Sequence, residues 1–104
     1  MPRTSDGFRA FVLDQLHDLR GVTCRATFGG FGLRCQDDFF GILYKGRLYF
    51  KVRPTTIADY KKLGMKPFRV SAKQTLKSYY EVPPDILEDA ESLVEWAKKS
   101  LERT

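Results

Sequence analysis

The sequence has few of the side chains on which enzyme and metal sites depend. Its 104 residues include one histidine and two cysteines. Cys24 and Cys35 lie 11 positions apart, and with a single distant histidine they match no zinc-ligand spacing. His17 falls near the polar centre of a predicted helix, where a solvated side chain is expected, and no base or nucleophile accompanies it. We therefore expect no catalytic residues, no metal site and no cofactor, and an enzyme or small-molecule binder is the least favoured class.

Long apolar runs are also absent. No window approaches the roughly 18 apolar residues that span a membrane, and the first seven residues, MPRTSDG, lack the apolar core of a signal peptide. We expect a cytoplasmic protein of bacterial type without membrane contact. No repeat, low-complexity tract or linker divides the chain, so residues 1–104 form a single domain, long enough to hold a core without metal or disulfides. Its 42% hydrophobic and 13% aromatic content argues against disorder.

The stretch 21–53 contains three turn signals, Gly29-Gly30, Asp37-Asp38 and Lys45-Gly46, which divide it into four short apolar runs. Such runs, rich in β-branched and aromatic residues, predict consecutive antiparallel strands. Apolar and polar residues alternate in the first and last runs, which is typical of strands buried on one face. We therefore predict a four-stranded meander with one apolar face.

Helical signals flank this meander. A helix is predicted from about Gly7 to Arg20, with Ser5-Asp6 as its cap and Gly21 after its end. After the meander we predict a short helix over 57–63, extended segments over 68–72 and 75–82, and a helical region from Pro84 with a longer helix over 90–103. The order α-β-β-β-β-α-β-β-α predicts an α+β fold of two layers, a mostly antiparallel sheet with helices packed on one face.

The glycine-rich turn bears on the two cysteines. If Gly29-Gly30 forms a two-residue hairpin loop, Cys24 lies directly opposite Cys35 and a cross-strand disulfide is sterically feasible. Two free thiols in a reducing cytoplasm are the favoured alternative. The glycines at 29–32 resemble part of a phosphate-binding loop, but neither a helix N-terminus nor a Lys-Ser/Thr pair follows them, so this interpretation is weak.

The net charge of +5 is unevenly distributed. Residues 37–80 carry ten bases and three acids, whereas residues 81–104 carry three bases and seven acids. The basic segment is able to attract an anion or nucleic acid. The favoured alternative is that the acidic C-terminal helix lies near it and neutralises much of its charge.

One strand concentrates basic and aromatic residues. In a flat strand, one face would hold Arg47, Tyr49, Lys51 and Arg53, with Lys45 in the preceding turn and Leu48, Phe50 and Val52 on the opposite face. Such a face can contact phosphates and stack on bases. We predict these five residues, Lys45, Arg47, Tyr49, Lys51 and Arg53, as the face for an anionic or protein partner. An ordinary solvated sheet face and subunit pairing stay open as alternatives.

Several segments carry a recognisable pattern. They are FVLDQL at 11–16, GVT at 21–23, FGGFGL at 28–33, RLYFKV at 47–52, YYEVP at 79–83 and LVEWA at 93–97. Together they resemble the N-terminal domain of the TfoX/Sxy family over about residues 8–102. The segment RLYFKV resembles the family's RLYLKV strand, although Arg53 follows it where an acidic residue is expected.

The resemblance implies a non-enzymatic regulatory role without a cofactor. Full-length members regulate natural competence, and hence DNA transformation, with the cyclic-AMP receptor protein at competence promoters, and they carry a second domain. We therefore expect a stand-alone TfoX N-terminal-like domain that acts in transcription regulation. Its partner would be a protein, such as a transcription factor of the cyclic-AMP receptor protein type, with weak DNA binding as a further expectation. The alternative is a small homodimeric structural or scaffolding domain.

Overall fold

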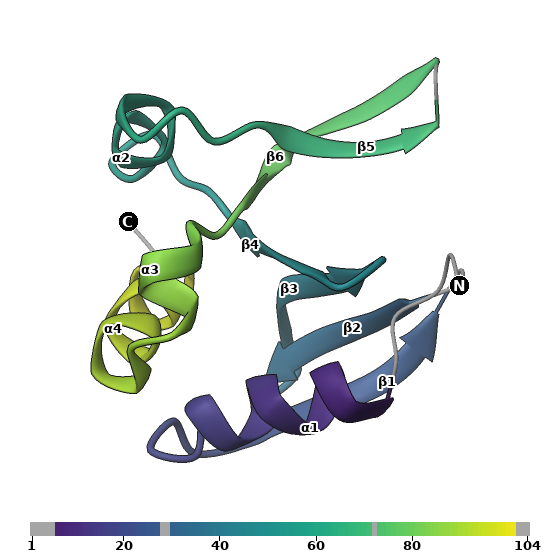
Figure 1. Cartoon of the computed structure of the whole chain (residues 1–104), viewed down its shortest axis with the longest axis vertical. Coiled ribbons are helices and arrows are strands. Elements are labelled where there is room, and N and C mark those ends of the chain that lie inside the picture. Colours follow the sequence, from purple (N-terminus) through teal and green to yellow (C-terminus); the bar gives the residue numbers. More distant parts are fainter. Residues whose placement is uncertain (1–5, 28–29, 72, 102–104) are drawn as a thin grey trace.

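The computed structural model describes residues 6–27, 30–71 and 73–101. Within these residues, six strands form one antiparallel sheet in the order β1-β2-β3-β4-β6-β5. The strands are β1 Val22–Thr27, β2 Gly30–Cys35, β3 Asp38–Tyr44, β4 Arg47–Lys51, β5 Pro67–Ser71 and β6 Gln74–Glu81. The helices are α1 Asp6–Gln15, α2 Ile57–Lys62, α3 Pro84–Leu87 and α4 Ala90–Leu101 (Figure 1). The predicted α+β class and element order are confirmed, with α3 and α4 together forming the closing helical region.

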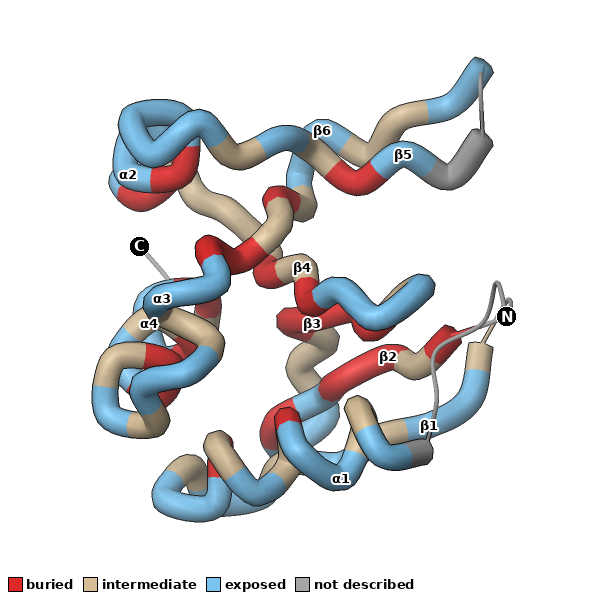
Figure 2. Tube along the Cα trace, viewed as in Figure 1, coloured by how far each residue is buried: buried red, intermediate tan, exposed pale blue. Residues whose placement is uncertain are grey.

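The main core lies between the sheet and the helices α1 and α4. α4 packs on β3 and β4 and also contacts α1. Strands β1 to β4 and β6 supply apolar residues to this core, and Figure 2 shows the burial concentrated in β2, β3 and β4. Fully buried members include Val12, Leu16, Leu33, Phe40, Leu43, Leu48, Phe50, Leu93 and Ala97. None of the helices in the described ranges is both long and apolar enough to cross a membrane.

Two tight turns set the middle of the sheet. Gln36 and Asp37 join β2 to β3 with φ of 50° and 74°, and Lys45 and Gly46 join β3 to β4 with φ of 52° and 74°. Positive φ at both central residues is the geometry of the mirror-image hairpin turns that match strand twist. The Lys45-Gly46 prediction is correct. The predicted Asp37-Asp38 turn is wrong by one residue, because Asp38 already pairs with Cys35 at the start of β3.

The register of β1 and β2 corrects the prediction for the two cysteines. Thr27 pairs with Gly30, so Cys24 lies opposite Leu33 and not opposite Cys35. Gly30 belongs to β2, and Gly29, the other residue of the predicted loop, lies outside the described residues. Both cysteines are free thiols, and burial raises the pKa of each. The thiol of Cys35 donates a hydrogen bond to the carbonyl of Arg20 at 3.1 Å.

The first helix is shorter than predicted. α1 ends at Gln15 and not at Arg20. Beyond it the backbone tightens, because the N–H of His17 donates to the carbonyl of Asp14 and that of Leu19 to Leu16, each three residues back. Gly21 then adopts a φ of 82°, which reverses the chain into β1. The predicted cap residue Ser5 and the end of the last predicted helix, residues 102–103, lie outside the described residues.

A bulge in β3 separates two adjacent phenylalanines. Leu33 pairs with Gly41, whereas Arg34 pairs with Phe39, so Phe40 is an extra residue in the ladder. Phe40 is fully buried in the main core, with its ring centroid 5.6 Å from that of Phe50. Phe39 lies on the opposite side of the sheet, which we call the outer face, the face turned away from α1 and α4.

The outer face holds a second apolar cluster. Ile42 pairs with Tyr49, and the ring centroid of Phe68 lies 4.7 Å from that of Tyr49 and 5.4 Å from that of Tyr44. Ile42 and Phe68 are each only 1% exposed. This outer cluster, formed by Ile42, Tyr44, Tyr49 and Phe68, attaches the β5–β6 hairpin to the middle of the sheet.

Candidate partner-binding face

The five residues predicted from the sequence do not form one open basic strip. Lys45 is exposed in the β3–β4 turn, with its Nζ 5.3 Å from the ring centroid of Tyr44. Arg47 is 60% exposed but is engaged in an ion pair. Its Nη1 donates to both carboxylate oxygens of Glu81, at 3.0 Å each, across the β4–β6 junction. The charge of Arg47 is therefore already paired with that of Glu81 in the protein without a partner.

Arg53 has a structural contact. It lies beyond β4, which ends at Lys51, so its predicted place on the strand face is wrong. Its Nε and Nη2 donate to the carbonyl of Ser100 at 3.3 and 3.1 Å. This carbonyl belongs to the last turn of α4, where the helix has no internal donor and where the dipole favours a cation. The guanidinium of Arg53 thereby fastens the end of α4 to the end of β4.

The remaining two predicted residues are half-buried on the outer face. Phe68 covers the ring of Tyr49, and burial, followed by the charge of Glu81, raises the pKa of the Tyr49 phenol. Tyr49 is thus a packing residue and is not available for base stacking. Lys51 pairs with Tyr79 of β6. The faces of β4 alternate as predicted, with Leu48 and Phe50 buried on the other side.

A different part of the outer face is hollowed. A groove of about 480 Å³ lies over β1, β2 and the start of β3, and we call it the outer groove. Its lining residues are Thr23, Arg25, Ala26, Thr27, Gly32, Arg34, Asp37 and Phe39. Gly32 makes room in this lining for the ring of Phe39. It pairs with Arg25 and has no side chain to fill the outer face, and the ring of Phe39 lies so close that a Cβ on Gly32 would be 2.7 Å from its Cε2 atom.

Two arginines and one acid, Asp37, carry the charges of the outer groove. Arg25 and Arg34 are both exposed, and the guanidinium carbon of Arg34 lies 5.2 Å from the ring centroid of Phe39. Nη1 of Arg34 also donates to the carbonyl of Asp37 at 3.3 Å, which holds the side chain in place. A fixed guanidinium beside an aromatic ring suits a carboxylate or phosphate carried on a larger partner.

Tyr79 extends this aromatic and basic surface. Its ring meets the edge of Phe39 at a centroid distance of 5.9 Å. Burial raises the pKa of Tyr79, while the positive charges of Arg53 and Arg34 act in the opposite direction. The sequence prediction missed Arg25, Arg34 and Phe39, since they come from three different strands. The polar alternation of Thr23, Arg25 and Thr27 was the one available signal for them.

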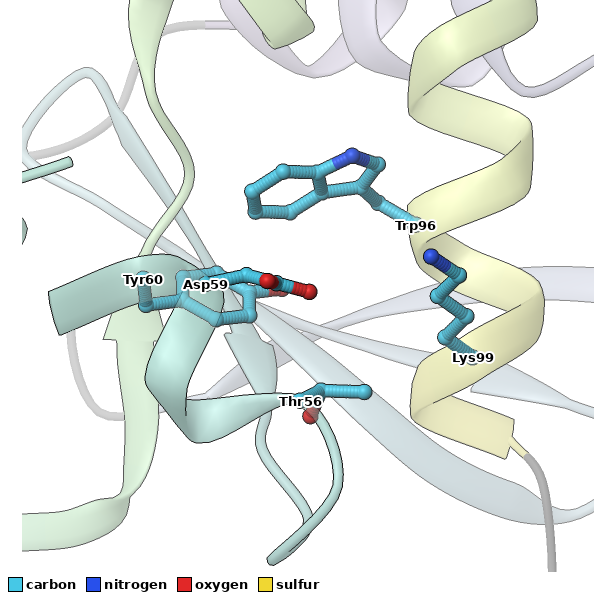
Figure 3. A pocket seen from close by; sticks show the side chains of 5 residues that line it. All are labelled: Thr56, Asp59, Tyr60, Trp96 and Lys99. Carbon is cyan, nitrogen blue, oxygen red and sulfur yellow. The ribbon is translucent and has the colours of Figure 1, made fainter. Parts of the chain in front are cut away.

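A second pocket, between α2 and α4, is too small for a ligand. Figure 3 shows Trp96 and Lys99 of α4 facing Asp59 and Tyr60 of α2, with Thr56 below them. The space amounts to about 10 Å³, roughly enough for one water molecule. The ring centroids of Tyr60 and Trp96 are 4.7 Å apart, and burial raises the pKa of Tyr60. These contacts are typical of packing between helices, so Trp96 is a packing residue.

Comparison with known proteins places the chain in a family. A comparison with curated proteins gave no match. The family model described as the TfoX N-terminal domain matches residues 14–104. This match includes all six strands, both sides of the outer groove and the contact between Arg53 and Ser100. The chain therefore belongs to the TfoX N-terminal domain family.

Proposed function

We propose that this chain is a non-enzymatic regulatory domain, a cytoplasmic transcriptional co-regulator that works by contact with a protein partner and with DNA. Membership of the TfoX N-terminal domain family supports this proposal. By the resemblance described above, the protein partner is a transcription factor of the cyclic-AMP receptor protein type, and the process is natural competence.

The outer groove is the observation that carries the proposal. It presents Arg25 and Arg34 beside Phe39 on rigid strands. Arginine and aromatic side chains are enriched in protein interfaces, because they combine large contact area with directional hydrogen bonds. Rigid strands also hold the guanidinium groups in position before binding, which lowers the entropy lost on association. An acidic segment of the partner protein fits this surface best.

The test is binding to a purified transcription factor of the cyclic-AMP receptor protein type, measured by calorimetry. Arg25→Gln with Arg34→Gln should weaken binding at least about tenfold, which corresponds to about 1.4 kcal/mol. The matched control is Arg20→Gln with Lys98→Gln, which removes the same charge from exposed positions outside the groove. Equal affinities of the two double variants would refute the assignment of the groove, and no binding by the unaltered chain would refute this partner class.

The homodimeric alternative has one specific observation in its favour. β1 is a six-residue strand at the edge of the sheet, and one of its two sides has no neighbouring strand among the described residues. An edge of this kind can pair with a second copy of the chain. Sedimentation decides the matter, since a monomer at micromolar concentration excludes a structural homodimer.

A further inference from the structure

The β5–β6 hairpin extends beyond the rest of the sheet. Only Tyr79–Glu81 of β6 pair with β4, so the preceding residues Gln74–Lys77 have β5 as their one neighbouring strand. These four residues span about 14 Å at the usual rise of a strand. Figure 1 shows the hairpin running out from the junction with β4, so that the end of β5 and the start of β6 lie far from α1 and α4. We call residues 67–71 and 73–77 the ribbon.

The ribbon lies in the most one-sided charge region of the chain. Between Tyr60 and Tyr80 the sequence has six basic residues and no acidic residue. They are Lys61, Lys62, Lys66, Arg69, Lys73 and Lys77, and each of them is exposed. Glu81, the first acid that follows, is bound by Arg47. The positive charge of this region is therefore not cancelled by acids within its own segment.

The packing of the ribbon fixes the direction of its basic side chains. Phe68 pairs with Leu76, and Arg69 pairs with Thr75. Successive residues of a strand point to opposite faces, so Arg69, which follows Phe68 directly, lies on the face opposite to Phe68. Lys77 lies where the β5–β6 ladder shifts register, just after Leu76, and is exposed. Because Phe68 is buried in the outer cluster, the face with Arg69 is turned away from the sheet, and the exposed Lys77 lies beside it.

We propose that this basic face of the ribbon contacts the phosphate backbone of duplex DNA. The inference deepens the proposed function by naming the element that supplies its DNA contact. A two-stranded ribbon fits the major groove of B-form DNA, which is about 12 Å wide. Lysine and arginine along it would replace the counterions of the phosphates.

DNA fits this surface better than a protein does. Among the ribbon residues whose side chains the structure describes, and Ser78 that follows them, the exposed ones are all polar or basic: Arg69, Lys73, Gln74, Lys77 and Ser78. A protein interface normally has an apolar centre, whereas interfaces with DNA are more polar and strongly positive. The proposed contacts are with phosphates, which position a protein on DNA and carry no sequence information directly.

The experiment measures binding of the full chain to a random 20-base-pair duplex by fluorescence anisotropy between 50 and 200 mM salt. The test variant is Arg69→Gln with Lys77→Gln. The control is Arg20→Gln with Lys98→Gln, which removes the same charge from exposed positions on the helical side. The test variant should bind at least tenfold more weakly at the lowest salt. The slope of log affinity against log salt should fall in magnitude by about two, since each lost phosphate contact contributes about 0.9.

Further measurements separate this inference from the proposed function. Arg69→Lys with Lys77→Arg keeps both charges and should retain the salt slope, and equal thermal midpoints of all variants show that each is folded. Equal DNA affinity of the test and control variants, or no binding of the unaltered chain at 50 mM salt, would overturn the ribbon as the DNA contact. Equal or tighter binding to polyglutamate would overturn DNA in favour of an acidic protein. None of these results alters the calorimetric test of the outer groove.

Discussion

At the scale of single residues, the role of Arg53 in the structure differs most from the role predicted for it. Sequence reasoning assigned it to an exposed binding face, but its guanidinium holds the carbonyl of Ser100 at the end of α4. Its own backbone N–H donates to Oγ1 of Thr56 at 2.9 Å, which starts the turn into α2. Arg53 thus joins the end of β4 to two helices, and its contribution is to folding.

This role predicts the effect of its removal. Arg53→Ala should lower the free energy of unfolding by about 1.5–3 kcal/mol, because a carbonyl loses two bonds from a charged donor. Arg53→Lys should recover only part of the loss, since an ammonium group cannot reproduce the planar fork. Urea denaturation measures both, with the exposed Arg20→Ala as control. If Arg53→Ala and Arg20→Ala unfold at the same urea midpoint, the contact of Arg53 with Ser100 does not contribute to stability.

At the scale of elements, the turn between β2 and β3 carries backbone strain that a substitution can release. Gln36 has a φ of 50°, a region that costs a residue with a side chain about 1–2 kcal/mol. Gln36→Gly should therefore stabilise the protein by about 1 kcal/mol, and raise the thermal midpoint by about 4–8 °C.

The adjacent hairpin supplies the opposite control. Gly46 has a φ of 74°, and a Cβ there would have no atom within 4 Å. Gly46→Ala should consequently lower the midpoint by a similar amount through backbone strain alone. A result in which both substitutions move the midpoint in the same direction would contradict this account of the two turns.

The elements also show how far the sequence predicts the structure. Hydrophobic period and Gly or Pro signals located each strand and helix of the predicted order, since these properties are local. The β2–β3 turn was wrong by one residue, because Gln36 gives no sign that it adopts a positive φ. The β1–β2 register was wrong because Gly30 is part of β2 and pairs with Thr27. The bulge at Phe40 could not be predicted, since it depends on which of Phe39 and Phe40 packs in the main core.

The candidate sites depend on contacts that no local pattern contains. Arg25, Arg34 and Phe39 meet in the outer groove only through the register of three strands. The ion pair of Arg47 with Glu81 joins residues 34 positions apart, and the burial of Tyr49 depends on Phe68 of another hairpin. The sequence shows that the middle of the chain is basic, but it does not show that some of these basic residues lie on a hairpin that extends beyond the sheet.

At the scale of the whole molecule, buried phenols on both sides of the sheet couple stability to alkaline pH. Burial raises the pKa of Tyr49, Tyr60 and Tyr79 above the ordinary value of 10.0. Above pH 10 these phenols ionise in the unfolded chain while they stay protonated in the folded one. Their stabilising effect is therefore complete below pH 10 and is lost as the pH rises through the folded values.

The urea midpoint should accordingly fall from pH 9.5 to pH 11. Tyr60→Phe removes the most buried of the three hydroxyl groups and should make this decline shallower, although it also loses the hydrogen bond with Ser100. Circular dichroism during urea titration at each pH measures the decline. An identical decline in the variant would show that other groups cause the alkaline effect.

The two borders of the sheet differ in a way that bears on aggregation. β5 begins with Pro67, which has no N–H to offer, and its ladder with β6 is irregular at two points. Both features block the addition of a further strand. β1, at the other border, is regular along its pairing with β2 and has no proline. When only one edge strand can pair with a second copy, two chains form a dimer in which both of these edges are used. Such a dimer cannot extend into a fibre, so strand addition in concentrated solution should stop at two copies.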